Sequence, residues 1–249
     1  MAMTHALTVM TIASAACAAT FIGGLLAVKF RDRLHLVLGF SAGAVIAVAF
    51  FDLLPEALAT GSPYFSAIEI LTTTAIGFFV YVLLDRIVLL HDHEAHSEQH
   101  DHGGATGRGF LGAGSFSAHS FLDGFAIGIA FEASRAVGIV VAVAVLVHDF
   151  SDGLNTVNVV LKNGGDRKGA LRWLAVDAVA PIAGAAVSLL VEFPQSVLAQ
   201  VLALFAGFFL YIGASDLLPE SHHAHPRFFT TFATLLGAAT LYAVTRIAA

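Results

Sequence analysis

The sequence predicts an all-α integral membrane protein that is built from eight transmembrane helices. Of its 249 residues, 57% are hydrophobic and only 12% are charged, and the mean hydropathy is +0.83. Soluble domains carry about 25% charged residues, so a soluble chain of this size could not bury so much apolar surface. The chain also divides into eight apolar stretches, each close to the roughly 20 residues that a helix needs to cross a bilayer.

We treat residues 1–249 as a single transmembrane domain. The first span contains small residues like those of a signal peptide, but no basic segment precedes it and its apolar stretch is too long. We therefore expect a transmembrane helix there rather than a cleaved leader. The eight predicted spans cover residues 6–28, 36–59, 64–90, 110–131, 136–161, 170–191, 196–219 and 228–247.

The distribution of Lys and Arg indicates how the spans are oriented. Ten of the twelve Lys and Arg residues lie in or beside the connections that follow spans one, three, five and seven. The other side holds only Arg135 and Arg246. Because cytoplasmic connections carry an excess of Lys and Arg, the odd-numbered connections are predicted to face the cytoplasm, with both termini outside.

The third connection, residues 91–109, differs in composition from the rest of the chain. Such a mixture of histidines, acids and glycines cannot build a packed core, so the segment is predicted to be a disordered cytoplasmic loop. His-rich tracts bind transition metals, which favours a regulatory loop that captures metal weakly over a solvated linker without such a role. Its five histidines are His91, His93, His96, His100 and His102.

A short motif occurs twice, as FDLLPEA at residues 51–57 and as SDLLPES at residues 215–221. These copies lie in spans two and seven, which are symmetric positions in an eight-span chain. The symmetry predicts a 3+2+3 arrangement with inverted outer repeats, a design that is typical of secondary transporters with a site near the membrane midplane. The candidate residues of a cation pathway, or alternatively of polar helix ends, are Asp52, Glu56, Asp216, Glu220, His222 and His223.

Spans four and five carry a second matched pair of motifs, HSFLDG and HDFSDG. Each places His and Asp four positions apart, His119 with Asp123 and His148 with Asp152, so that both side chains project from one helix face. Ionisable side chains are costly inside a span and usually have a functional partner. A lone intramembrane His is commonly an interhelical hydrogen-bond partner, but two motifs with the same spacing favour a shared metal site.

Two imidazoles and two carboxylates form a ligand set of borderline hardness. The set suits Zn²⁺, Fe²⁺, Mn²⁺ or Co²⁺ better than Cu⁺, which prefers sulfur ligands. Ser120 and Asp149 follow the two histidines and are rotated by about 100°, so they are predicted to reach a second metal position that shares the two aspartates. Asp177 in span six is a further candidate ligand, with an ion pair to Arg172 as the alternative.

Composition also limits the classes of partner and cofactor. Cys17 is the only cysteine, which excludes an internal disulfide and any cysteine-based zinc motif. The chain has 12 Lys and Arg residues and no basic patch interleaved with aromatics, so nucleic acid is not an expected partner.

These features resemble the ZIP (zinc- and iron-regulated transporter-like) metal-ion transporters, and the chain looks like a prokaryotic member of that family. The similarity extends over nearly the whole chain and includes the spans, the His-rich loop and both DLLPE copies. HSFLDG is similar to the family's HN-x-x-(D/E)-G motif, and HDFSDG to its (H/Q)-(D/E)-x-x-E-G motif. Two positions depart from the pattern: Ser120 stands where Asn is usual, and Ala180 stands where Glu commonly precedes the proline.

The resemblance implies a binuclear metal centre between spans four and five. It also implies movement of divalent metal toward the cytoplasm, with zinc first and iron, manganese and cadmium as further cargo. Its pattern places His119, Asp123, His148 and Asp152 at the main position, with Asp149 at the neighbouring one. A homodimer in the lipid bilayer of a bacterial inner membrane is implied as well.

Two other functions use similar residues. An intramembrane zinc-dependent hydrolase also needs His and Asp inside spans around an open metal position, but it does not need the duplicated DLLPE motifs. A membrane metal sensor would bind metal without flux. We expect a transporter without enzymatic activity, in which spans two, four, five and seven move as one domain.

Overall fold

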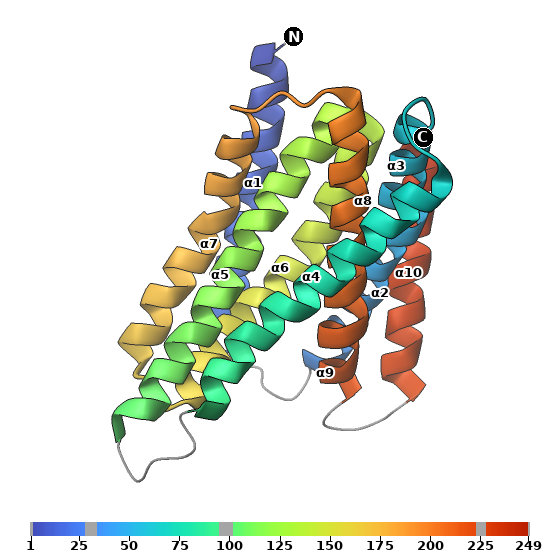
Figure 1. Cartoon of the computed structure of the whole chain (residues 1–249). Helices are drawn as coiled ribbons and strands as arrows, with labels where there is room; N and C mark the ends of the chain where they lie inside the picture. Colours follow the sequence, from blue (N-terminus) through green and yellow to red (C-terminus); the bar gives the residue numbers. More distant parts are fainter. Residues whose placement is uncertain (1, 28–33, 95–101, 223–227, 249) are drawn as a thin grey trace.

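The computed structural model describes residues 2–27, 34–94, 102–222 and 228–248, and these ranges are almost entirely helical, with no β-strand (Figure 1). This confirms the all-α fold class. The helices are α1 (Ala2–Ala27), α2 (Leu34–Val48), η1 (Ala49–Leu53), α3 (Leu54–Gly61), α4 (Ala67–Glu94), α5 (His102–Ala133), α6 (Arg135–Lys162), α7 (Arg167–Ser188), α8 (Gln195–Tyr211), η2 (Ile212–Leu217), α9 (Leu218–His222) and α10 (Phe228–Ala248).

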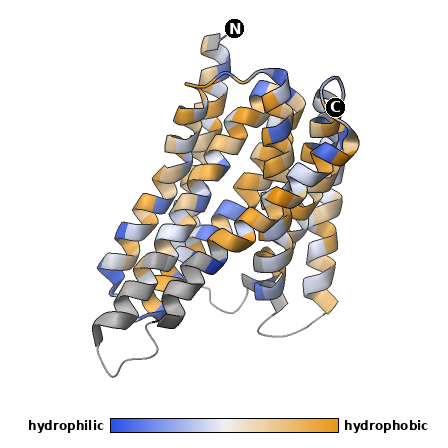
Figure 2. Cartoon of the chain, in the orientation of Figure 1, coloured by the Kyte–Doolittle hydropathy of each residue, from blue (hydrophilic) through white to orange (hydrophobic). Residues whose placement is uncertain are grey.

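Each of the eight predicted spans corresponds to a helical path in the described residues. Spans two and seven are composite, because α2, η1 and α3 continue into one another, as do α8, η2 and α9. Seven of the paths are long and apolar enough to cross a membrane, and apolar residues cover much of the helices in Figure 2. The remaining path, α5, is long but less apolar, because it carries serines, a histidine and an aspartate within its span.

The predicted loop at residues 91–109 is shorter than expected. Helix α4 continues to Glu94 and α5 already begins at His102, so both ends of the predicted disordered segment are helical. A physical reason is that extending an existing helix adds one hydrogen bond per ordered residue without a new nucleation step. Residues 95–101, which include His96 and His100, lie outside the described part of the chain.

The two DLLPE copies adopt the same unusual backbone. The π-helices η1 and η2 each lead directly into a Leu-Pro-Glu sequence. The N–H of Leu54 bonds to the carbonyl of Ala49, and the N–H of Leu218 to that of Gly213, so each bond spans five residues. Proline cannot donate a backbone hydrogen bond and its ring crowds the carbonyl four residues earlier, which explains why a wider turn precedes it in both copies.

Among the residues that the structure describes, four helix pairs cross at reciprocal glycines. In each pair, a Cβ on either glycine would collide with a backbone carbonyl oxygen of the other helix, so only glycine allows this approach. The pairs are α1 with α6 at Gly23 and Gly153, α5 with α7 at Gly124 and Gly184, α2 with α10 at Gly43 and Gly237, and α4 with α8 at Gly77 and Gly207.

These crossings divide the strongest helix contacts into two bundles. Helices α1, α5, α6 and α7 form the site bundle, and α2, α3, α4, α8, α9 and α10 with the two π-helices form the companion bundle. Spans two and seven therefore pack with spans three and eight, which does not support the expected grouping of spans two, four, five and seven. In an inverted 3+2+3 repeat, span one corresponds to span six and span five to span four. The contact of span one with span five and that of span six with span four agree with this correspondence, and the 3+2+3 arrangement stays a prediction.

The two DLLPE segments lie toward opposite ends of the molecule. Both termini lie at one end of the bundle, together with α3, and α9 lies at the opposite end (Figure 1). The two DLLPE copies are therefore at opposite ends, as an inverted repeat requires. Helix α4 runs obliquely across the front of the molecule and crosses α8.

Candidate metal centre

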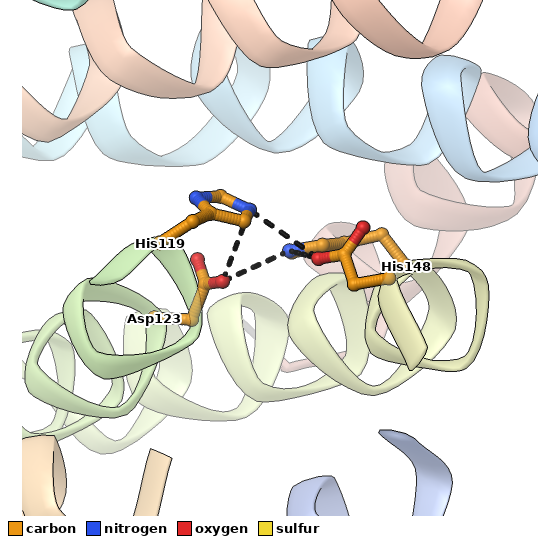
Figure 3. Close-up of side chains that lie close together, drawn as sticks. His119, Asp123 and His148 are labelled. Atoms are coloured by element: carbon orange, nitrogen blue, oxygen red, sulfur yellow. Dashed lines mark hydrogen bonds and ion pairs between the residues drawn. The ribbon is translucent and has the colours of Figure 1, made fainter. Parts of the chain in front are cut away.

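Helices α5 and α6 present the matched histidines and aspartates to one another. The i, i+4 spacing of each pair places both of its side chains on one helix face, as predicted. Figure 3 shows the imidazoles of His119 and His148 on either side of the Asp123 carboxylate. One ligand atom from each of His119, Asp123, His148 and Asp152 lies within 4.8 Å of the other three. The four residues therefore converge on one point between the helices.

The distances between these atoms fit a four-coordinate metal. Four ligand atoms at about 2.1 Å from a central ion in tetrahedral geometry are about 3.4 Å apart. His119 Nε2 lies 3.2 Å from Asp123 Oδ2 and 3.4 Å from Asp152 Oδ2. His148 Nε2 lies 3.3 Å from Asp123 Oδ2 and 3.9 Å from Asp152 Oδ2. These four separations lie within about 0.5 Å of the tetrahedral value.

The cluster is buried and carries polar atoms that have no hydrogen-bond partner among the described residues. The exposed fraction is 8% for His119, 2% for Asp123, 0% for His148 and 3% for Asp152. Within the described ranges, His119 Nε2 and Asp152 Oδ2 form no hydrogen bond. Buried polar atoms without hydrogen bonds are costly, and a bound dication would offset that cost.

Both histidines have a partner at Nδ1, which directs Nε2 toward the cluster. His148 Nδ1 lies 2.9 Å from the carbonyl oxygen of Ala144, one turn earlier on α6. His119 Nδ1 lies 3.2 Å from the hydroxyl of Tyr81 on α4. A carbonyl can only accept, so His148 donates from Nδ1 and keeps the Nε2 lone pair for a metal.

Asp149 lies beside the cluster. Its Oδ1 is 3.8 Å from His148 Nε2, its side chain is fully buried, and neither oxygen has a hydrogen-bond partner in the described residues. The side chain is therefore available as a ligand of a second position.

Ser120 and Asp177 lie together, but they are already engaged. Ser120 donates a hydrogen bond of 2.8 Å to Asp177 Oδ1, and Thr156 donates one of 2.7 Å to Asp177 Oδ2. All three side chains are fully buried. Arg172 is exposed, and an ion pair between it and Asp177 is not among those of the described residues. The partners of Asp177 are therefore hydroxyls rather than a cation.

The predicted pathway residues that the structure describes do not belong to the four-residue cluster. Asp52 lies in η1 with an exposed fraction of 7%, and its Oδ2 has no hydrogen-bond partner in the described ranges. Glu56 is half-buried in α3 and accepts a hydrogen bond from Thr60, whereas Glu220 is exposed in α9. Asp216 belongs to η2 and His222 ends α9, while His223 lies outside the described residues.

Three of the five histidines of the predicted loop belong to described helices. His91 and His93 belong to the last turns of α4, and His102 is the first residue of α5.

Sequence reasoning missed three polar contacts around the cluster. Thr156 continues the i, i+4 series of His148 and Asp152, so its place on the site face was available from spacing. Tyr81 and Ser41 gave no such signal. Ser41 on α2 donates a hydrogen bond of 3.1 Å to the carbonyl of Val147, and its oxygen lies 3.4 Å from that of Ser151.

Comparison with known proteins places this site in a family context. The family model described as "ZIP Zinc transporter" matches residues 91–245, which is more than half of the chain and includes the whole cluster. "Zinc transporter ZIP10" of Danio rerio is 37% identical over 106 residues, which cover 42% of this chain and 12% of that protein. "Zinc transporter SLC39A7" of Homo sapiens is 33% identical over 120 residues, which cover 45% of this chain and 26% of that protein. This chain therefore spans only a small part of the length of these relatives.

Proposed function

Because this chain belongs to the ZIP zinc transporter family, we propose that it carries divalent transition-metal ions across a membrane through the His119–Asp152 cluster. The observation that carries the proposal is the convergence of four ligand atoms within 4.8 Å of one another, at buried positions of two neighbouring helices. Zinc is the first proposed cargo. Fe²⁺, Mn²⁺ and Cd²⁺ are further candidates, because imidazole and carboxylate ligands accept them as well.

We propose one principal metal position. It is formed by His119, Asp123, His148 and Asp152, whose separations suit tetrahedral coordination. Asp149 is proposed to contribute to a second, weaker position next to it. Ser120 and Asp177 stay candidates for that position, although their hydrogen bonds with each other and with Thr156 must rearrange before they bind a metal.

We propose that the DLLPE segments are the two ends of the route. Helix α3, which carries Glu56 and directly follows η1 with Asp52, lies at the end that holds the termini. Helix α9, which carries Glu220 and directly follows η2 with Asp216, lies at the other end. The asymmetric distribution of Lys and Arg supports a cytoplasmic location for the second end. The proposed direction of transport is from the first end to the second.

The cellular setting is proposed from the sequence pattern. A bacterial inner membrane with both termini outside is supported by the Lys and Arg distribution, and a homodimer is suggested by the family resemblance. We propose that the histidines at the α4–α5 connection capture metal on the cytoplasmic side. Alanine at all five positions should then alter the capacity or regulation of uptake and leave transport itself intact.

Transport assays test the proposal directly. We expect proteoliposomes that contain the chain to take up radiolabelled zinc, and we expect His119→Ala and Asp152→Ala to abolish that uptake. Glu192→Ala is the matched control, since it removes an exposed acid outside the helices. Undiminished uptake by both site variants would contradict the assignment of the cluster as the transport site.

Binding measurements separate transport from the two alternative functions. Family membership argues against an intramembrane hydrolase, because ZIP proteins are transporters. A metal sensor would bind zinc with His119 and Asp152 and show no flux in the proteoliposomes. Zinc binding without uptake by the unmodified protein would therefore favour the sensor.

A further inference from the structure

The two histidines of the metal centre are oriented by partners of different kinds. His148 donates from Nδ1 to the carbonyl of Ala144 on its own helix, over 2.9 Å. His119 has its Nδ1 partner, the Tyr81 hydroxyl at 3.2 Å, on α4. Helix α4 belongs to the companion bundle, whereas α5 belongs to the site bundle. One histidine is thus oriented locally and the other from across the bundle interface.

The partner at Nδ1 decides whether a histidine can bind metal through Nε2. A neutral imidazole carries its hydrogen on one nitrogen only, and the other nitrogen supplies the lone pair. A hydrogen bond from Nδ1 fixes this tautomer and the ring orientation, and loss of such a bond typically weakens metal affinity about 10- to 100-fold. The hydroxyl of Tyr81 is an acceptor that can hold His119 in the metal-binding tautomer.

The position of the Tyr81 hydroxyl is set by the companion bundle. The Tyr81 ring packs edge-on against Phe208 at 5.5 Å and lies 5.2 Å from the ring of Tyr211, both on α8. It also meets the His119 ring edge-on, with 6.1 Å between centroids and 90° between planes. Any displacement of α4 and α8 relative to α5 would therefore move the hydroxyl away from Nδ1.

We propose that Tyr81 is a positioning residue that completes the metal centre only while α4 lies against α5. This inference rests on the proposed function and deepens it. His148 keeps its orientation in every arrangement of the bundles, because its partner moves with it. His119 keeps its orientation only in the docked arrangement, so zinc binds that arrangement more tightly and is released more readily when the bundles shift.

A second contact between the bundles provides a matched control. Ser41 on α2 donates to the carbonyl of Val147 on α6, at the depth of the cluster, and its side chain is fully buried. Its two partners, the Val147 carbonyl and the Ser151 hydroxyl, are not proposed metal ligands. Ser41→Ala removes a hydrogen bond between the bundles without releasing a histidine, whereas Tyr81→Phe removes the histidine partner and keeps the aromatic ring.

The test measures zinc affinity by competition with a fluorescent chelator, using the full-length purified chain. We expect Tyr81→Phe to weaken zinc binding by about tenfold or more, because a metal ligand loses its hydrogen-bond partner. We expect Ser41→Ala to change zinc affinity by less than about twofold, because no metal ligand loses a partner. In the uptake assay, Tyr81→Phe should raise the zinc concentration at half-maximal rate. Nitrogen-15 NMR of labelled histidines, with His119→Ala for assignment, should show that Tyr81→Phe mixes the two tautomers of His119.

The outcomes separate this inference from the proposed function. Absence of zinc binding in the unmodified chain would overturn the proposed function and this inference with it. Normal zinc binding in the unmodified chain, with Tyr81→Phe unchanged or with Tyr81→Phe and Ser41→Ala weakened equally, would overturn this inference alone. If Tyr81→Phe does not fold, 3-fluorotyrosine at position 81 replaces it. Its weaker acceptor oxygen should also weaken zinc binding, and an unchanged affinity would reject the role of Tyr81.

Discussion

Asp123 connects the two helices of the metal centre: its Oδ2 lies 3.3 Å from His148 Nε2 on α6 and only 3.2 Å from His119 Nε2 on α5. A single carboxylate oxygen is thus adjacent to both imidazoles. Asp152 also lies near both histidines, but its Oδ2 is farther from them, at 3.4 Å from His119 Nε2 and 3.9 Å from His148 Nε2. Loss of the Asp123 carboxylate therefore removes the closest link between the two imidazoles among the described ion pairs.

We therefore expect Asp123→Ala to weaken zinc binding by more than the roughly 10- to 100-fold that changes beside a metal ligand cost. Chelator competition and native mass spectrometry check the result. Glu192→Ala is the control for loss of one acidic charge and should bind zinc like the unmodified chain. If Asp123→Ala retained normal affinity, the proposed ligand set would be wrong.

The hydroxyls of Ser120 and Thr156 around Asp177 are expected to contribute to folding stability rather than to metal binding. Thr156→Val removes the donor to Asp177 Oδ2 and keeps the side-chain shape, so it should lower the free energy of unfolding by about 1 kcal/mol. Thr156→Ser keeps the hydroxyl and should stay closer to the unmodified chain. Unfolding in detergent monitored by circular dichroism measures both variants.

Zinc affinity distinguishes the two roles of Asp177. If the Asp177 carboxylate contributes only to stability, the zinc affinity of both Thr156 variants should stay within about threefold of that of the unmodified chain. This change is much smaller than the roughly 10- to 100-fold loss expected beside a metal ligand. A large loss of affinity in Thr156→Val, without loss of stability, would indicate that Asp177 binds the metal.

The glycine crossings should be intolerant of even one methyl group. A Cβ at Gly153 would collide with the carbonyl oxygen of Thr20, which is backbone and cannot rotate away. We expect Gly153→Ala to destabilise the chain by about 1–3 kcal/mol or more. Gly114→Ala is the matched control on the neighbouring helix, where the nearest atom, in the Trp173 ring, is 3.6 Å away. Melting temperatures that fall equally in both variants would refute the role of the crossing.

Asp52 should affect the rate of transport rather than the affinity of the central site. Its carboxylate is almost fully buried in η1, near the proposed entrance, and is not one of the four clustered ligands. We expect Asp52→Asn to lower the maximal uptake rate by about tenfold, which corresponds to a barrier higher by about 1.4 kcal/mol. Equilibrium zinc binding should be unchanged, and a parallel loss of affinity would place Asp52 at the metal site itself.

The sequence was sufficient to predict the features that depend on neighbouring residues. Hydropathy and length located the eight helical paths, because each span must satisfy its own backbone in lipid. The i, i+4 spacing placed His119 with Asp123 and His148 with Asp152, because helix geometry is fixed over one turn. The weakest hydropathy signal came from α5, since the residues that form the site are those that make the helix less apolar.

Contacts between distant helices could not be predicted in this way. Tyr81 is 38 positions from His119 and lies on another helix, so no periodicity relates them. The grouping of spans two and seven with three and eight depends on glycines that meet across helices, and many glycines in the chain do not form such crossings. The hydrogen bond between Thr156 and Asp177 was missed for the same reason, because spacing along α6 does not show which residue of α7 faces Thr156.

The four glycine crossings also limit the mechanical freedom of the molecule. At each crossing the two backbones touch on both sides, so neither helix can roll about its own axis without driving a carbonyl into its neighbour. We therefore expect the two helices of each crossed pair to move together as a rigid body. We therefore expect relative motion to occur by sliding between the crossed pairs, along surfaces such as that of α2 against α6, where the described residues form no reciprocal glycine crossing.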